Sequence, residues 1–291
     1  GAGKTFVALH FVLDTIRKDP SNRVLFVAAN PALSVFVARW LAARVNGARA
    51  RRKLLAQLHV MSAETHEPRG VTVGKNSGAL ELIEAESASY ALIVMDEAHH
   101  ACRDEKLLAA VLEHRRGDDQ DLAKLVLLSD ISQATVEVDA EFPEDLVEIL
   151  LEEVVRSSKR IVAGASAFQL GGDRIMLTRC HHESEGPPLK SYVFPEVKSG
   201  EEDAAACYSR YTVKGLKNLL AQFSTLSLHS RLALLVPDDA FLARFRPHLQ
   251  RGLAEAFGDR TFRLVSAREG AATLSEDSRS TSDEQWLVLD T

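Results

Sequence analysis

Residues 1–5 read Gly1-Ala2-Gly3-Lys4-Thr5, the second half of the phosphate-binding pattern G-x-x-x-x-G-K-[ST]. In that pattern the glycines let backbone N–H groups close around phosphates, the lysine reaches the β- and γ-phosphate oxygens, and the threonine hydroxyl ligates Mg²⁺. We therefore expect this segment to bind ATP, with Thr5 as a magnesium ligand. A chance Gly-Lys-Thr at the start of a helix is the alternative that these five residues alone leave open.

The sequence after this segment alternates helices with buried strands. Apolar residues recur at helical spacing up to Lys18, and Asp19-Pro20 ends that run. Continuous apolar runs at 23–29, 91–96 and 125–128 predict strands that are buried on both faces, as in a parallel sheet. Because helical segments separate these runs, we expect an α/β fold of the P-loop NTPase type, with its site at the carboxyl ends of the strands.

Two consecutive carboxylates, Asp96 and Glu97, stand at the end of the second apolar run. In a nucleotide-hydrolysing site the first acid orients the Mg²⁺ coordination shell, and the second acts as general base for the attacking water. We therefore expect Asp96 to be a magnesium ligand and Glu97 to be catalytic. The alternative is that the two acids simply begin a helix, where acids are favoured.

Four motifs in order resemble the core of superfamily 1 helicases of the UvrD/Rep type. They are the phosphate-binding loop, a DEAH-like box at 96–99, a D-x-x-Q element at 130–133, and LEEVVRSSKRIVAGA at 151–165, which is similar to L-x-x-x-Y-R-S-x-x-x-I-x-x-x-A. The resemblance covers residues 1 to about 170 and implies an ATP- and Mg²⁺-dependent hydrolase that acts on DNA or RNA. It implies that Gln133 senses the γ-phosphate and that Arg156, which we expect to open a helix, points at it. Arginine suits this role because it stays charged and offers a planar donor fork.

Three positions depart from the UvrD/Rep pattern. His99, Ser129 and Val155 stand where those enzymes usually carry Gln, Gly and Tyr. The tyrosine stacks on adenine in the relatives, and a valine cannot stack. The DEAH-like box and the N-P-x-L sequence from Asn30 are closest in style to Schlafen-type helicase-like ATPases. We expect His99 to couple the nucleotide site to neighbouring loops.

The composition changes near residue 172, where Gly171-Gly172-Asp173 indicates a turn. We expect a first RecA-like domain over 1–172 and a second, incomplete RecA-like domain over 173–291, with helices near 202–223 and 238–257. The chain lacks an initiator Met and opens inside a motif, so we expect a fragment truncated at both ends. Because a second-domain arginine would be missing, the fragment alone is expected to hydrolyse ATP poorly, whereas the full-length protein does so.

Charge favours nucleic-acid binding only locally, because 35 Lys and Arg residues against 41 Asp and Glu residues give the chain a net charge of −6. Asn30-Pro31 predicts the start of a second helix, and a basic run of Arg44, Arg49 and 51–53 follows that helix. The resemblance implies that this region contributes to a single-strand channel. DNA or RNA is therefore the expected partner. The alternatives left open are a signalling or regulatory P-loop NTPase switch without unwinding activity, and a degenerate inactive remnant.

Cysteine content and hydropathy bear on the compartment. The three cysteines cannot form a disulfide framework, which favours a reducing, intracellular compartment, cytoplasmic or nuclear. No apolar run approaches the ~18–20 residues of a membrane span, so no membrane partner is expected. The clusters at 99–102 and 180–182 lack the paired ligand spacing of zinc sites, so no zinc is expected at either.

Overall fold

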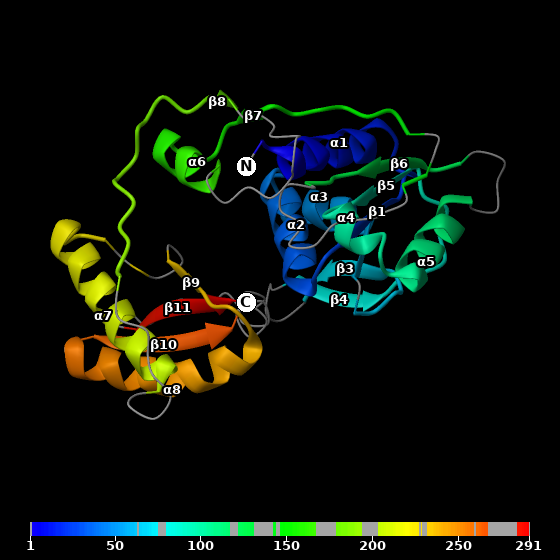
Figure 1. Cartoon of the computed structure of the whole chain (residues 1–291). Helices are drawn as coiled ribbons and strands as arrows, with labels where there is room; N and C mark the ends of the chain where they lie inside the picture. Colours follow the sequence, from blue (N-terminus) through cyan, green and yellow to red (C-terminus); the bar gives the residue numbers. More distant parts are fainter. Residues whose placement is uncertain are drawn as a thin grey trace. The chain divides into compact units, whose positions relative to one another are not determined.

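The structure is a computed structural model that describes residues 2–62, 64–74, 80–116, 122–130, 142–143, 146–166, 179–193, 203–226, 228, 232–258, 260–266 and 284–290. The chain divides into two compact units, Gly1–Leu189 and Lys190–Thr291 (Figure 1). The domain boundary expected near residue 172 falls between 167 and 178, outside the described residues.

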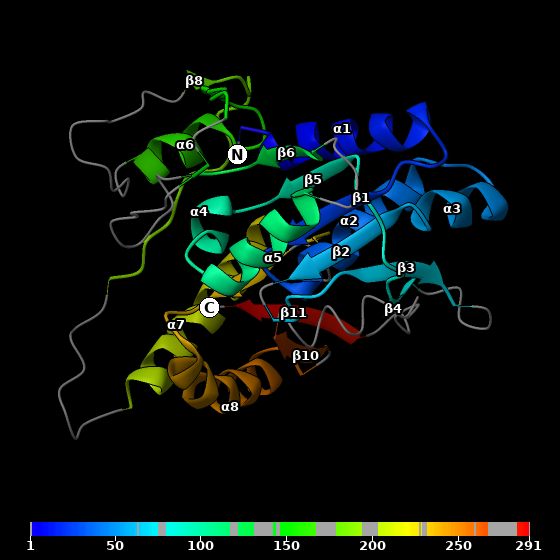
Figure 2. The same ribbon diagram turned by 90° about the vertical axis from the view of Figure 1, so that its right-hand side faces the viewer.

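A six-stranded, mostly parallel sheet forms the first unit, in the order β4-β3-β2-β1-β5-β6 (Figure 2). Four strands are parallel: β1 (Val24–Ala28), β2 (Leu58–Ser62), β5 (Leu92–Met95) and β6 (Lys124–Leu127). The other two, β3 (Arg69–Val73) and β4 (Leu80–Glu84), are antiparallel additions at one edge. The α/β fold expected from the sequence is confirmed.

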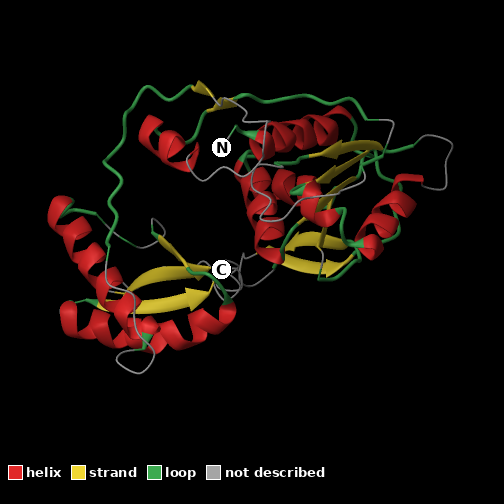
Figure 3. Ribbon diagram, in the orientation of Figure 1, coloured by secondary structure: helices red, strands yellow, loops and turns green. Residues whose placement is uncertain are grey.

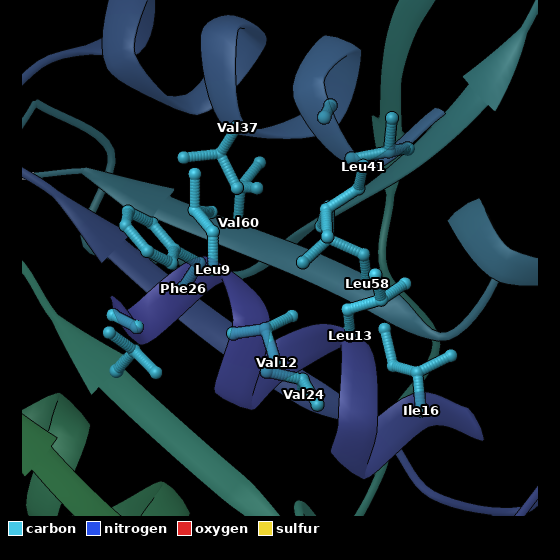
Figure 4. Packing of buried hydrophobic residues seen from close by; sticks show 14 of the residues in the cluster. Leu9, Val12, Leu13, Ile16, Val24, Phe26, Val37, Leu41, Leu58 and Val60 are labelled. Carbon is cyan, nitrogen blue, oxygen red and sulfur yellow. The ribbon is translucent and has the colours of Figure 1, made fainter. Parts of the chain in front are cut away.

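Helices cover both faces of this sheet. The helices α1 (Lys4–Lys18), α2 (Pro31–Ala43) and α3 (Ala48–Leu55) contribute to one apolar core, whereas α4 (Ala98–Ala101) and α5 (Glu105–Arg116) contribute to the other. Val24 and Phe26 of β1 point into the first core, beside Leu9 and Val12 of α1 (Figure 4). The alternate residues of β1 point into the second core. Burial on both faces explains why β1 is apolar at every position.

The rest of the first unit that the structure describes includes residues 151–165, the motif that contains Arg156. A short parallel pair is formed by β7 (Glu153–Val154) and β8 (Arg179–Cys180), and α6 spans Lys159–Ser166. The expectation that Arg156 opens a helix is wrong. Arg156 lies in a bend after β7, three residues before α6, whose first N–H, that of Lys159, donates to the Ser184 carbonyl at 3.2 Å.

The second unit contains a three-stranded parallel sheet in the order β10-β11-β9, with two long helices (Figure 3). Its strands are β9 (Ala233–Leu235), β10 (Thr261–Ser266) and β11 (Glu284–Asp290), and its helices are α7 (Ala204–Gln222) and α8 (Asp239–Ala256). Asp203 and Asp238 cap the two helices, as their side chains accept N–H bonds in the first turn. Within the described part of the chain, no helix has the length and hydropathy needed to cross a membrane.

Candidate nucleotide-binding site

Three chain segments meet at the carboxyl edge of the parallel strands. Lys4 begins α1, Asp96 and Glu97 follow β5, and Asp130 follows β6. Figure 2 shows the start of α1, the arrowheads of β5 and β6, and α4 at the same end of the sheet. Ligands of open α/β sheets bind at this edge, because the loops that follow parallel strands converge there.

Gly3 gives the candidate phosphate-binding segment its backbone shape. It is the N-cap of α1 and has φ 86°, in the left-handed region that residues other than glycine rarely adopt. A Cβ atom built on Gly3 would lie 3.5 Å from Cγ2 of Val155. Val155 therefore packs next to the phosphate-binding segment, and the side chain of the following residue, Arg156, is exposed.

Lys4 and Thr5 each contact one of the carboxylates at this edge. Nζ of Lys4 lies 2.8 Å from Oδ2 of Asp130, and the Thr5 hydroxyl donates to Oδ2 of Asp96 at 3.1 Å. Asp96 is only 4% exposed, and burial raises its pKa, although bonds from Thr5 and the Glu97 N–H oppose the shift. A hydroxyl oxygen beside a buried carboxylate fits Mg²⁺, a hard cation that takes oxygen ligands.

Glu97 has an unusual backbone for a residue other than glycine. Its φ and ψ are 50° and 45°, a conformation that costs about 1–3 kcal/mol and persists only where the surroundings hold it. Its N–H donates to Oδ1 of Asp96 at 3.0 Å, and the next N–H, that of Ala98, donates to the Leu128 carbonyl at 2.8 Å. The Glu97 side chain makes no capping hydrogen bond to α4, so helix capping does not explain this acid. Burial, and next the charge of Asp96, raise the pKa of Glu97.

His99 joins the two loops of the site. It is fully buried, and its Nδ1 accepts the Asp130 N–H at 3.3 Å, with the Ser129 hydroxyl 3.4 Å away. The backbone donor at Nδ1 requires the proton of the neutral ring to be on Nε2. Nε2 lies 3.6 Å from Oε2 of Glu97 and has no hydrogen bond within the described structure. Burial, and next the charge of His100, lower the pKa of His99, which favours this neutral form.

The structure thus brings together most of the site predicted from the sequence. Ala2 and Gly3 lead into Lys4 and Thr5, which contact the loops after β5 and β6. Gly1 and Gln133 lie outside the described residues. Asp130 was not singled out from the sequence as a partner of Lys4, although its place in the D-x-x-Q element was the available signal.

The basic run lies away from these residues. It is carried by the end of α2 and by α3, which immediately precedes β2 and therefore lies at the amino edge of the parallel strands. Figure 2 shows α3 at the end of the sheet opposite α4. The run is therefore not beside the candidate nucleotide site.

Comparison with known protein families gives a match that lies within the first unit. Residues 1–118 match the family model described as type III restriction enzyme, res subunit. The match supports a helicase-like P-loop NTPase. The matched region includes the candidate phosphate-binding segment, Asp96, Glu97 and His99, and ends after α5. No curated protein sequence matches the chain.

Proposed function

We propose that the chain is the ATP-binding and ATP-hydrolysing part of a helicase-like motor that acts on DNA or RNA. The observation that carries this proposal is the meeting of Lys4, Thr5, Asp96 and Glu97 at the carboxyl edge of a parallel sheet. These are the residue types that phosphoryl transfer requires, in separate roles. The parallel sheet of the second unit supports a second RecA-like domain.

Nucleotide binding would use the start of α1. Backbone N–H groups at Gly1 to Thr5 and the dipole of α1 would hold the phosphates, and the Lys4 ammonium would move from Asp130 to the β- and γ-phosphate oxygens. Thr5 and Asp96 would hold Mg²⁺, which supplies positive charge against the phosphates. Asp96 is suited to this because its carboxylate is already fixed by the Thr5 hydroxyl and the Glu97 N–H.

Hydrolysis would depend on Glu97. A general base works best when its pKa approaches the working pH, and burial already raises the pKa of this carboxyl. The Nε2–H of His99 faces Oε2 of Glu97 at 3.6 Å, so His99 would act as a positioning residue for the base. Because the other ring nitrogen bonds to Asp130, this orientation is tied to the loop after β6.

Arg156 and Gln133 would complete the site by contacting the γ-phosphate. The position of Val155 next to Gly3 supports this role for Arg156, because the next residue along the chain is the arginine. The role of Gln133 rests on the resemblance to superfamily 1 helicases of the UvrD/Rep or Schlafen type. Val155 offers no ring for adenine, so base stacking by this position is not part of the proposal.

The test compares ATP binding and turnover of the wild-type protein with those of its variants. Lys4→Ala is expected to abolish ATP binding, because it removes the charge that meets the β- and γ-phosphates; unchanged affinity would refute the phosphate-loop assignment. DNA or RNA oligonucleotides are expected to stimulate the wild-type ATPase rate. ATP hydrolysis that neither nucleic acid stimulates would instead support a regulatory NTPase switch.

A further inference from the structure

Seven exposed cations gather at the amino edge of the first unit's sheet. We call this set the basic edge. It comprises two residues in the last turn of α1, one residue after α2, and four residues of α3: Arg17, Lys18, Arg44, Arg49, Arg51, Arg52 and Lys53. The chain as a whole has a net charge of −6, so the basic edge is a local positive region on an acidic protein.

A buried amide holds the parts of the basic edge together. Gln57, 4% exposed, lies two residues after the end of α3, and its Nε2 is 3.4, 3.2 and 3.0 Å from the carbonyl oxygens of Ile16, Asp19 and Asn22. These carbonyls belong to the end of α1 and the turn that leads into β1. The end of α3 is therefore fixed against the end of α1, and their cations lie on adjoining elements.

Acidic residues neutralise little of this charge. Among the described residues, no member of the basic edge forms an ion pair. Asp14 and Asp19 are the acids on the same segments, and Asp19 accepts bonds from the N–H and hydroxyl of Ser21. The positive potential of the surface is thus left to face solvent.

Helix stabilisation explains only some of these cations. Arg17, Lys18, Arg52 and Lys53 lie in last turns, where a positive charge favours the helix dipole. Arg49 is in the first turn of α3, where a cation is unfavourable, and it is four residues before Lys53, a spacing at which like charges repel. Its presence therefore suits an external anion better than the helix itself.

We propose that the basic edge binds the phosphate backbone of a nucleic-acid duplex, at a site separate from the nucleotide site. The proposal rests on the proposed function for the class of partner. Single-strand sites combine cations with aromatic platforms for the bases. Here α3 has no aromatic residue, and the ring of Trp40 is covered by the Arg44 guanidinium, 4.2 Å from its centroid. Repeated cations without a stacking surface fit the regular phosphates of a duplex.

The test measures binding of a labelled blunt duplex of about two helical turns to the nucleotide-free chain, by fluorescence anisotropy over a range of salt concentrations. We expect the triple variant R49A/R52A/K53A to weaken binding and to reduce the salt slope of log K by about 0.9 for each phosphate that the variant no longer neutralises. The charge-preserving variant R49K/R52K should retain the wild-type slope. Thermal unfolding confirms that each variant is folded, which is expected since all three positions are exposed.

A matched control removes the same charge elsewhere. K217A/R244A/R251A changes three exposed cations on α7 and α8 and should leave duplex binding unchanged. An equal decrease in this control would overturn the proposal, because overall charge would then explain binding. Tighter binding of a single strand, or binding of phosphatidylserine vesicles without binding of the duplex, would overturn it as well.

The two proposals can fail separately, because the duplex assay needs no ATP. Lys4→Ala should retain duplex binding while it no longer binds ATP. Duplex binding through the basic edge without nucleic-acid stimulation of ATPase would refute the proposed motor function alone. If nucleic acid stimulates the ATPase but the R49A/R52A/K53A variant binds the duplex as tightly as the wild type, only the duplex site is refuted.

Discussion

In the structure the ammonium of Lys4 is already paired, 2.8 Å from the carboxylate of Asp130. In the proposed binding mode, a nucleotide would displace Asp130 before Lys4 could contact its phosphates. Asp130→Asn removes the competing charge and keeps the backbone N–H that bonds to His99. The variant is therefore expected to bind ATP and ADP more tightly, whereas substitutions in a binding site usually weaken binding.

The size of the effect follows from the exposure of the pair. The side chains of Lys4 and Asp130 are 24% and 19% exposed. Fully exposed pairs contribute about 0.2–1 kcal/mol, and breaking a buried pair costs about 3–5 kcal/mol. A value of about 1–2 kcal/mol lies between these limits and corresponds to affinities roughly 5–30-fold higher.

Isothermal titration with ADP and with a slowly hydrolysed ATP analogue measures this change directly. Asp104→Asn is the matched control, because Asp104 is an acid of the same unit that accepts from His66 and from the first turn of α5 rather than from Lys4. Its nucleotide affinity should be unchanged. Unchanged or weaker binding by the Asp130→Asn variant would show that the Lys4–Asp130 pair does not oppose nucleotide binding.

Three further results are expected. Glu97→Gln should leave ATP affinity nearly intact and slow hydrolysis by at least about a hundredfold, within the range for removal of a general base; weakened binding with retained turnover would reverse the roles of Asp96 and Glu97. Because the folded-state pKa of Glu97 is raised, its ionisation costs stability above that pKa, so Glu97→Gln should raise the thermal midpoint at neutral pH, and the difference should vanish below the ordinary value of 4.5. Arg156→Ala should weaken the binding of ATP by about 1.5–3 kcal/mol and that of ADP much less, since only ATP presents the γ-phosphate. Equal weakening for both nucleotides would show that Arg156 is a surface residue without a role at the γ-phosphate.

Local patterns predicted the elements whose environment is simple. The apolar run at 23–29 predicted β1 because both faces of this strand are buried, and Asn30-Pro31 predicted the start of α2, where Oδ1 of Asn30 accepts the Leu33 N–H at 2.9 Å. The strands β2, β3 and β4 were not predicted. β2 is buried along its length, but His59 and Ser62 interrupt its apolar sequence. β4 is the edge strand and is mostly exposed, and β3 beside it is only partly buried, so neither has a continuous apolar run.

Contacts between distant segments were the part that the sequence could not supply. Lys4 and Asp130 are 126 residues apart, and no periodic pattern joins them. The start of α6 depends on the carbonyl of Ser184, which is why the local sequence predicted a helix start at Arg156 and the structure has none there. The left-handed backbone of Glu97 likewise depends on the Leu128 carbonyl, which fixes the following residue.

In the proposed mechanism, the loop after β6 would link phosphate binding at Lys4 to Glu97, the proposed general base. Asp130 pairs with Lys4 through its carboxylate and with His99 through its N–H. The opposite nitrogen of His99 faces Glu97 at 3.6 Å, slightly beyond hydrogen-bond distance. When phosphates replace the Asp130 carboxylate at Lys4, this loop loses its contact with Lys4, whereas the bond to His99 remains. A small shift of the imidazole would then close the gap to Glu97, so that the base would be oriented only after Lys4 has bound its phosphates.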